Sequence, residues 1–474
     1  MEKKRLPNII FLLCDTLGAK HLSLYGYHRA TTPNVERIVE QGQFAVYKRC
    51  FSPASWTIPA HASFFTGLYP SEHGVDDDHV YFPDNYYCLA EILKNQGYRT
   101  YGVSANGLVS RLLNFDRGFD AFYEMWHLFN SEDFFAPNQL FSRSKKQVEG
   151  ELQRFALLLK ITFSNGNYLF AFKKMVDTLY KKIYGIPKMI DKSSLATLRA
   201  FWTSRMIMAK TDPHTPFFLF LNVMEAHNQY NPPRKYNHFI KIDSGTKKRL
   251  MEKYEWQHYA LAPFSREDFE LLTLLYDQEV LFLDTLIGNF YSFLKERNLL
   301  KNTIVIIASD HGELIGEHGH CSHMFTLYNE LLHVPLIIRY PRDFGIRGET
   351  NRLVQLHDIF ATILEIVESP FPVPDSSQSL LSAPREFAVS ESIHCNRPIR
   401  KLKTKNPSFI LQDFMQPYIS IITKDMLKII RRADGQVELY DLNRDLYETH
   451  ELSNSPAYAQ QKMKLLQLLE EAYY

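Results

Sequence analysis

The run Thr303-Ile-Val-Ile-Ile-Ala308, followed by Ser309-Asp-His-Gly-Glu313, decides the fold of this chain. Its unbroken apolar residues are typical of a strand buried on both faces, and it ends in a carboxylate and an imidazole. Near the start, Asn8-Ile-Ile-Phe-Leu-Leu-Cys14 runs in the same way into Asp15. Open α/β sheets bind ligands at the carboxyl ends of their strands. Two such ends therefore predict a metal site, although either aspartate alone could simply cap the following helix.

Strand-like and helix-like segments alternate along the first 380 residues, which predicts an α/β fold with a mostly parallel sheet flanked by helices. We expect strands at 8–14, 45–51, 99–104, 216–223, 303–309 and 335–340, with helices such as 32–41, 89–96 and 267–296. Farther on, short β segments at 386–392, 418–423, 426–431 and 437–440 precede a helix at 457–472. We therefore expect a main domain over 1–380 and a small C-terminal α+β subdomain over 381–474, with an antiparallel sheet and a packed helix. The prolines at 370, 372 and 374 mark the linker.

The composition excludes some classes of function. The chain has 474 residues and a net charge of +1 at pH 7, so no global field attracts nucleic acid. No nucleic-acid module is recognisable, and no apolar run is long enough to span a bilayer. The five cysteines, at 14, 50, 88, 321 and 395, form no Cys-x-x-Cys motif, which favours reduced thiols. The short apolar run after the basic start is typical of a strand and not of an export signal, so we expect a cytoplasmic protein.

Residues 125–200 form a basic helical insertion in this prediction. Within them, Arg143 to Lys192 carries eleven Lys or Arg residues and four acidic ones, together with apolar clusters. This stretch could be a solvated helical hairpin packed on the core, or a lid over a site. A third interpretation is peripheral contact of 143–192 with an anionic membrane, which would favour a lipid head group or lipid-linked glycan as the substrate.

The segment Ser52-Pro-Ala-Ser-Trp-Thr57-Ile-Pro-Ala-His61 opens a helix-like run that Gly67 ends. Thr57 then lies at a helix N-terminus, where unpaired N–H groups and the helix dipole favour an anion. A hydroxyl that binds a divalent cation at such a place can act as a nucleophile. In the simpler alternative, Thr57 only caps the helix.

Taken in their order along the chain, these segments resemble the sulfatase family of the alkaline phosphatase superfamily. The resemblance covers nearly the whole chain and implies an alkaline-phosphatase-like fold, with a sulfatase-like catalytic domain over 1–380. The matching pieces are Pro7-Asn-Ile-Ile, Cys14-Asp-Thr-Leu, Tyr25-Gly-Tyr, Thr32-Pro-Asn, the Thr57 segment up to Thr66-Gly-Leu-Tyr-Pro70, Tyr276-Asp-Gln-Glu279 with Asp284, Ser309-Asp-His-Gly-Glu313, Gly316-Glu-His-Gly, His333-Val-Pro-Leu-Ile-Ile and Glu438-Leu-Tyr-Asp-Leu.

The departures from the family pattern concern the nucleophile. Sulfatases that use formylglycine carry Cys or Ser in a Cys/Ser-x-Pro-x-Arg motif, where this chain has Thr57-Ile-Pro-Ala-His61. Threonine cannot be converted to that aldehyde, so no formylglycine is expected. The pattern is closer to a Thr-nucleophile branch that resembles phosphodiesterases, phosphonate monoester hydrolases and phosphoglycerol transferases.

The resemblance also implies roles for individual residues. One divalent metal ion would be held by Asp15, Thr57, Asp310 and His311, and this mixed oxygen and nitrogen set favours Mn or Zn, with Mg or Ca as alternatives. The catalytic residues would be Thr57 as nucleophile and His227 as the proton donor to the leaving group. Three further residues are predicted to bind the substrate: His61, at the position of the family's anion-binding arginine, Asn106 and His323.

We therefore predict a metal-dependent hydrolase that cleaves phosphate or phosphodiester-type esters through Thr57. Water or an acceptor alcohol can displace a phosphothreonine, whereas the easy exit that formylglycine offers to sulfate is missing. The alternatives are a sulfuric ester hydrolase, a transferase of a phospho-group to an acceptor alcohol, and a binding protein on a sulfatase scaffold. We expect a small-molecule, lipid-linked or glycan-linked ester as the partner, and the sequence leaves the oligomeric state open.

Overall fold

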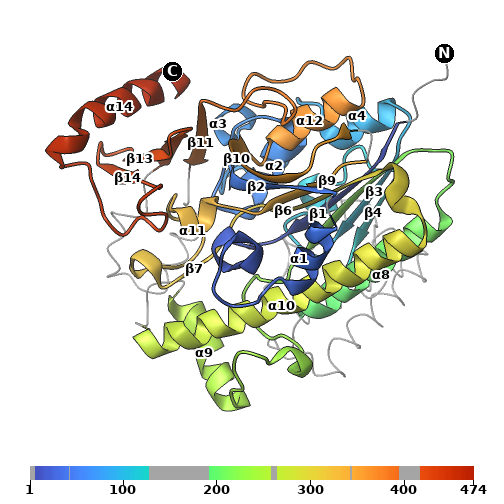
Figure 1. Cartoon of the computed structure of the whole chain (residues 1–474), viewed down its shortest axis with the longest axis horizontal. Helices are drawn as coiled ribbons and strands as arrows, with labels where there is room; N and C mark the ends of the chain where they lie inside the picture. The colour runs from blue at the N-terminus through green and yellow to red at the C-terminus, as the bar shows by residue number, and fades with distance from the viewer. Residues whose placement is uncertain are drawn as a thin grey trace, which may run out of the picture.

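The computed structural model describes residues 6–41, 43–126, 192–257, 264–341, 344–393 and 417–473. An eight-stranded sheet forms the centre of the molecule, with the strand order β10-β2-β9-β6-β1-β5-β3-β4 (Figure 1). Every neighbouring pair in it is parallel except the pairs of β9, which runs antiparallel to β2 and β6. The strands are β1 (Asn8–Cys14), β2 (Phe44–Phe51), β3 (Arg99–Ser104), β4 (Ala121–Glu124), β5 (Phe217–Val223), β6 (Thr303–Ser309), β9 (Leu336–Arg339) and β10 (Gly348–Gln355).

Helices cover both faces of this sheet, as the continuous apolar strands require (Figure 1). Alternate residues of β1 enter opposite cores: Ile10 and Leu12 pack on one face, Ile9 and Phe11 on the other. The first core is completed by α1 (Pro33–Glu40), α8 (Lys192–Lys210) and α10 (Arg266–Glu296). The second is completed by α2 (Thr57–Thr66), α4 (Leu89–Asn95) and α12 (Asp358–Ile366). The predicted α/β architecture is confirmed.

Two strands of the sheet were not predicted. The edge strand β10 has the sequence Gly-Glu-Thr-Asn-Arg-Leu-Val-Gln, and its first half is largely exposed, so it lacks an apolar run. The other edge strand, β4, has only four residues. Edge strands pair on one side only and need little apolar surface, which is why a search for apolar runs misses them.

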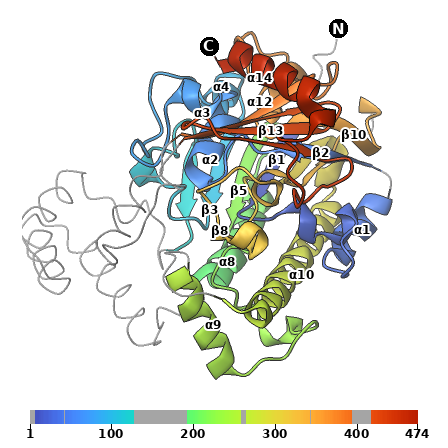
Figure 2. The same ribbon diagram turned by 90° about the vertical axis from the view of Figure 1, so that its left-hand side faces the viewer.

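A second sheet of four antiparallel strands lies beside the main one: β11 (Phe387–Ser392), β12 (Tyr418–Thr423), β13 (Leu427–Arg432) and β14 (Val437–Asp441) (Figure 2). One of its faces packs on the main domain, where Ile422 and Ile430 join a core with Phe51 and Leu332. Its other face packs on Leu465 and other residues of α14 (Ala459–Tyr473). The predicted antiparallel sheet with a packed helix is therefore confirmed.

Some predictions concern residues outside the described ones. Residues 127–191 are not described, so most of the basic insertion at 125–200, its proposed lid role and the membrane contact through 143–192 lie outside the structure. The described residues contain no helix that is both long and apolar enough to cross a membrane. Cys14, Cys50, Cys88 and Cys321 are free thiols, and Cys395 falls in an undescribed range.

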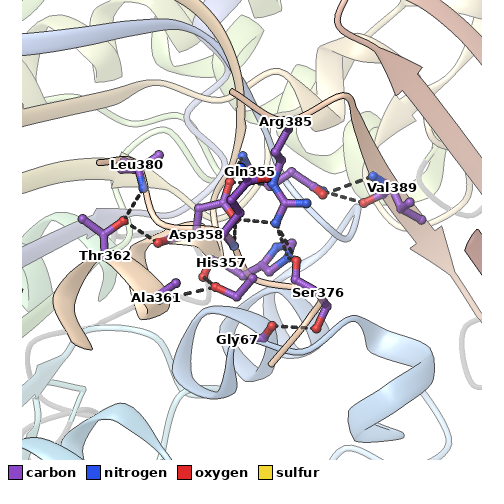
Figure 3. Close-up of polar contacts among 12 residues, drawn as sticks. Gly67, Gln355, His357, Asp358, Ala361, Thr362, Ser376, Leu380, Arg385 and Val389 are labelled. Atoms are coloured by element: carbon purple, nitrogen blue, oxygen red, sulfur yellow. Dashed lines mark hydrogen bonds and ion pairs between the residues drawn. The ribbon is translucent and has the colours of Figure 1, made fainter. Parts of the chain in front are cut away.

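A buried polar network ties the linker to the main domain (Figure 3). The guanidinium of Arg385 donates from Nε to Asp358 Oδ2 at 2.7 Å, and its Nη2 donates to the carbonyl oxygen of Ser376 at 2.5 Å and to Asp358 Oδ1. Ser376 Oγ in turn donates to the carbonyl oxygen of Gly67 at 3.0 Å. Gly67 ends α2 in a left-handed conformation, with φ of 78°. The network therefore anchors the C-terminal end of the helix that begins with Thr57.

Replacing Asp358 by asparagine should destabilise the fold strongly, because it leaves the buried Arg385 guanidinium without its counter-charge. Removing one partner of a buried ion pair costs about 3–5 kcal/mol, which urea unfolding can measure. The control is Lys424→Gln, which breaks the exposed pair with Glu386 at 2.6 Å and should leave the free energy of unfolding within experimental error. Similar losses in both variants would contradict the role given to Asp358.

The buried carboxylate of Glu391 in β11 should make the free energy of unfolding depend on pH. It accepts hydrogen bonds from Ser71 N at 2.7 Å and Ser71 Oγ at 2.8 Å, and burial raises its pKa from 4.5 to about 7. A folded-state pKa above the unfolded value means that the contribution to stability is complete below pH 4.5 and is lost as pH rises through 7. Between these limits about 3 kcal/mol is at stake.

Glu391→Gln should therefore be more stable than the wild type at pH 8, and by a smaller margin or none at pH 5. Urea unfolding of both proteins at several pH values measures the difference in the free energy of unfolding. A difference that stays constant across this range would show that Glu391 does not titrate as its burial requires.

Candidate active site

Two buried carboxylates emerge side by side at the carboxyl edge of the sheet. Cys14 is the register partner of Ser309 across β1 and β6, so the next residues, Asp15 and Asp310, leave adjacent strands at the same level. Both side chains are completely buried. Burial raises the pKa of Asp15 to about 7, helped by the neighbouring Asp310 carboxylate, and burial likewise raises the pKa of Asp310 to about 7.

His311 and Thr57 complete this group. The Nδ1–H of His311 donates to the carbonyl oxygen of Gly312 at 2.8 Å, so its Nε2 is the atom that meets Thr57 Oγ1 at 3.3 Å. Thr57 is the first residue of α2, and Trp56 occupies the N-cap position. The hydroxyl of Thr57 therefore does not cap its helix and instead faces the ring of His311.

The donor set fits a divalent cation. Asp15, Asp310 and His311 each offer a ligand atom, and these atoms lie within 4.8 Å of one another. Asp15 Oδ1 and Asp310 Oδ2 are buried and accept no hydrogen bond. Two buried, mutually repelling carboxylate oxygens with no donor are costly unless a positive charge lies between them. The structure thus brings together the four residues that were predicted to hold the metal.

Close backbone packing shapes the loop that carries His311. A Cβ atom on Gly312 would lie 1.9 Å from the carbonyl oxygen of Glu330, so only glycine fits at this position. The Gly312 N–H donates to the carbonyl oxygen of Leu331 at 2.8 Å. Ser309 Oγ adds a second constraint, because it accepts from Leu17 N at 2.9 Å and donates to the carbonyl oxygen of His311 at 2.7 Å.

His227 and His323 lie beside the metal-ligand group. The ring of His323 is 4.6 Å from that of His311 and 5.4 Å from that of His227, between ring centroids. The Nδ1–H of His227 donates to the carbonyl oxygen of Asn228 at 2.6 Å. Burial lowers the pKa of His227, but the carboxylates of Asp15 and Glu313 outweigh it and leave the pKa above the usual value. An imidazole whose pKa is raised in this way suits a proton donor.

Glu313 orients His323 and was not singled out as a functional residue in the sequence. His323 Nδ1 donates to Glu313 Oε1 at 3.1 Å, which directs the other ring nitrogen away from this carboxylate. Burial and the nearby His311 hold the pKa of His323 well below its ordinary range. The only sequence signal for Glu313 is that it ends the Ser-Asp-His-Gly-Glu segment.

The structure corrects the predicted substrate contacts of His61 and Asn106. His61 Nδ1 donates to the carbonyl oxygen of Thr57 at 2.8 Å, while its Nε2 accepts from Asn222 Nδ2 at 2.7 Å. Burial lowers the pKa of His61 to about 3, so this ring is neutral and both its nitrogens are engaged. Asn106 donates to Asp15 Oδ2 and accepts from Leu108 N at 2.8 Å. His61 has no ring nitrogen left for a substrate, and the side chain of Asn106 positions the carboxylate of Asp15.

Carboxylates, an imidazole and a hydroxyl that share the edge of such a sheet define a metal-dependent ester hydrolase. The family model described as Sulfatase matches residues 7–369, and the chain belongs to the sulfatase family of the alkaline phosphatase superfamily. A second model, described as N-sulphoglucosamine sulphohydrolase, C-terminal, matches residues 316–473. The family resemblance stated from the sequence is thereby confirmed.

Individual relatives carry sulfatase names or related ones. The N-acetylglucosamine-6-O-sulfatase of Bacteroides thetaiotaomicron is 23% identical and the match covers 99% of this chain and 87% of that protein. A second similar protein has been solved in complex with its own substrate, D-glucosamine-2-N,6-O-disulfate. Its structure matches with a TM-score of 0.68 and 18% identity, and the match covers 98% of this chain and 97% of that protein. The phosphonate monoester hydrolase of Agrobacterium radiobacter has a TM-score of 0.71 and 17% identity, covering 98% and 95%.

These relatives bear on the predicted function. They are hydrolases, which confirms the prediction of an enzyme. Their names support the sulfuric ester alternative better than the phosphoric ester that we expected from the sequence.

The two aspartates should control metal binding. Purified wild-type protein should bind Mn²⁺ or Zn²⁺, and Asp15→Asn or Asp310→Asn should lose the ion in metal analysis and calorimetry. Without metal at pH 8, Asp310→Asn should melt at a higher temperature than the wild type, because it removes a buried carboxylate that repels Asp15. Asp84→Asn, at a carboxylate with 74% side-chain exposure, is the control and should bind like the wild type. Undiminished binding by Asp310→Asn would place the metal elsewhere.

Proposed function

We propose that this protein hydrolyses a sulfate ester, or a closely related phosphate ester, of a small hydroxylated molecule, with Thr57 as the nucleophile. The observation that carries the proposal is the contact of Thr57 Oγ1 with His311 Nε2 at 3.3 Å, at the N-terminus of α2 and beside two buried carboxylates. A helix N-terminus favours the anionic ester, because its first N–H groups have no acceptor within the helix.

The reaction has two steps. In the first, the deprotonated Thr57 Oγ1 attacks the sulfur or phosphorus, and the bond to the leaving oxygen breaks as that oxygen takes a proton from His227. In the second, water attacks the same sulfur or phosphorus and gives a proton to His227, and the bond to Thr57 Oγ1 breaks, which restores the threonine alkoxide and the protonated His227. The Nδ1–H of His227 donates to the carbonyl oxygen of Asn228 at 2.6 Å, which leaves Nε2 as the ring nitrogen that exchanges the proton in both steps.

The ion would be held by Asp15, Asp310, His311 and Thr57. A divalent cation bound there would lower the pKa of the threonine hydroxyl and would neutralise negative charge on the oxygens of the ester. The mixed oxygen and nitrogen donors favour Mn or Zn, with Mg or Ca as alternatives. His61, through the carbonyl oxygen of Thr57, and Asn106, through Asp15, keep the hydroxyl and the carboxylate in place.

Two arguments point to different substrate classes. The sulfated sugars named for the relatives support a sulfate ester, and we place this class first. The threonine favours phosphorus, because it cannot form the aldehyde hydrate that expels sulfate in formylglycine enzymes. A phosphate ester or phosphodiester is therefore the second candidate, and transfer to an acceptor alcohol would be a variant of its second step. A cytoplasmic location stays a prediction.

A panel of p-nitrophenyl sulfate, phosphate, bis-phosphate and phenylphosphonate, with glucosamine sulfates as a sugar series, separates these classes. Turnover of sulfates alone would support the first, and turnover of phosphorus esters alone the second. Added glycerol that captures the phospho-group in the product would show transfer. Inactivity on every ester by protein loaded with metal would contradict the proposal.

Thr57→Val should lower kcat by about 10³-fold or more, because it removes the nucleophilic oxygen and keeps the shape of the side chain. The matched control is Thr66→Val in the same helix, whose hydroxyl donates to the carbonyl oxygen of Ala62 at 2.7 Å, and it should keep wild-type turnover. Acid-quenched wild-type protein should carry the transferred group on the peptide that contains Thr57. Full activity of Thr57→Val would refute the nucleophile.

A further inference from the structure

Six consecutive residues in the middle of α10, Leu275 to Val280, are buried, which a helix packed by one face cannot achieve. Tyr276, Asp277, Gln278 and Glu279 have relative exposures of 0%, 0%, 1% and 3%. A helix that packs one face on a core buries residues three and four positions apart. Burial of six in succession therefore requires that other segments cover α10 on further sides.

One of the covering segments follows β1 and carries Asp15. Tyr276 Oη donates to the carbonyl oxygen of Thr16 at 2.7 Å and accepts from Gly18 N at 3.1 Å. The carboxylate of Asp277 then accepts from His21 Nδ1 at 2.9 Å, from Tyr27 Oη at 2.8 Å and from Arg29 Nη1 at 2.9 Å.

The other covering segment follows β5 and His227. Gln278 Oε1 accepts from Phe239 N at 3.2 Å and from Ile240 N at 3.0 Å. The carboxylate of Glu279 accepts from Asn231 N. Neighbouring residues of a single helix thus hold the two segments that carry a metal ligand and the proton donor.

Thr16 is the point at which this support matters most. Its φ of 54° lies in the left-handed region, which a β-branched residue rarely adopts. Its N–H donates to Asp310 Oδ1 at 3.3 Å, and its carbonyl oxygen accepts from Tyr276. The two contacts fix both ends of the residue next to Asp15, so they also fix where the Asp15 carboxylate stands relative to that of Asp310.

We propose that Tyr276 is a positioning residue that sets the metal affinity of the site through the Thr16–Gly18 turn. This inference rests on the metal site of the proposed function, but not on the identity of the ester. Partners that orient metal ligands typically account for about 10- to 100-fold in metal affinity. Tyr276→Phe removes the hydroxyl alone, and the ring keeps its packing against Tyr230 and His21.

The test is calorimetric titration of chelator-treated protein with Mn²⁺ at pH 7.5. Tyr276→Phe should raise the Kd by about 10- to 100-fold. One matched control is Tyr98→Phe, which removes a buried hydroxyl that donates to the carbonyl oxygen of Pro7 at 2.8 Å, just before the amino end of β1. A second is Gln278→Met, two positions along α10 from Tyr276, which frees only the segment after His227. Both controls should bind Mn²⁺ with the wild-type Kd.

The outcomes separate the inference from the proposed function. A wild-type Kd in Tyr276→Phe overturns the inference while the metal site stands. An equal rise in Kd in all three variants also overturns it, because general loosening of the fold would then explain the loss. Wild-type protein that binds no Mn²⁺ overturns both. Urea midpoints of Tyr276→Phe and Tyr98→Phe should fall by similar amounts, which shows that any difference in Kd is not a difference in stability.

Discussion

Two buried carboxylates that face each other, Asp15 and Asp310, impose the constraint on which the site depends. Parallel pairing of β1 with β6 places them side by side and fully buried, where each charge raises the energy of the other. A sheet edge can keep such a pair charged only if a cation neutralises it. The fold therefore holds, at the end of two of its most apolar strands, an arrangement that loses stability unless an ion is bound.

Much of the remaining structure holds other functional side chains close to these two carboxylates. The N-terminus of α2 presents Thr57, and the Arg385–Asp358 network holds the opposite end of the same helix through Ser376 and Gly67. From the other face of the sheet, α10 fixes the segments that follow β1 and β5. The residues that we propose as metal ligands, nucleophile and proton donor thus follow four different strands, β1, β2, β5 and β6. The helices α2 and α10 support the segments that carry Thr57, Asp15 and His227.

The sequence predicts those parts of the molecule that rest on local pattern. Continuous apolar runs locate the central strands, and polar residues directly after β1 and β6 locate the residues that we propose as metal ligands. Interactions between distant segments cannot be read in this way. His61 was expected to face the substrate, but its partner Asn222 is 161 positions away and occupies its second nitrogen. Glu313 was overlooked for the same reason, since its function depends on His323 folding back across a short hairpin, β7 (Leu314–Ile315) with β8 (Cys321–Ser322).

The C-terminal sheet has a consequence for any attempt to work with a shorter protein. Ile422, Ile430 and their neighbours cover Phe51 and Leu332, so a truncated chain that stopped at the linker would open this apolar interface to solvent. The buried ammonium of Lys428 also donates to the carbonyl oxygen of Leu327 at 2.6 Å and pairs with Glu448. Leu327 lies four residues after His323 in the chain. A protein truncated at the linker would therefore be less soluble, and the loop that follows His323 would lose the contacts that hold it in place.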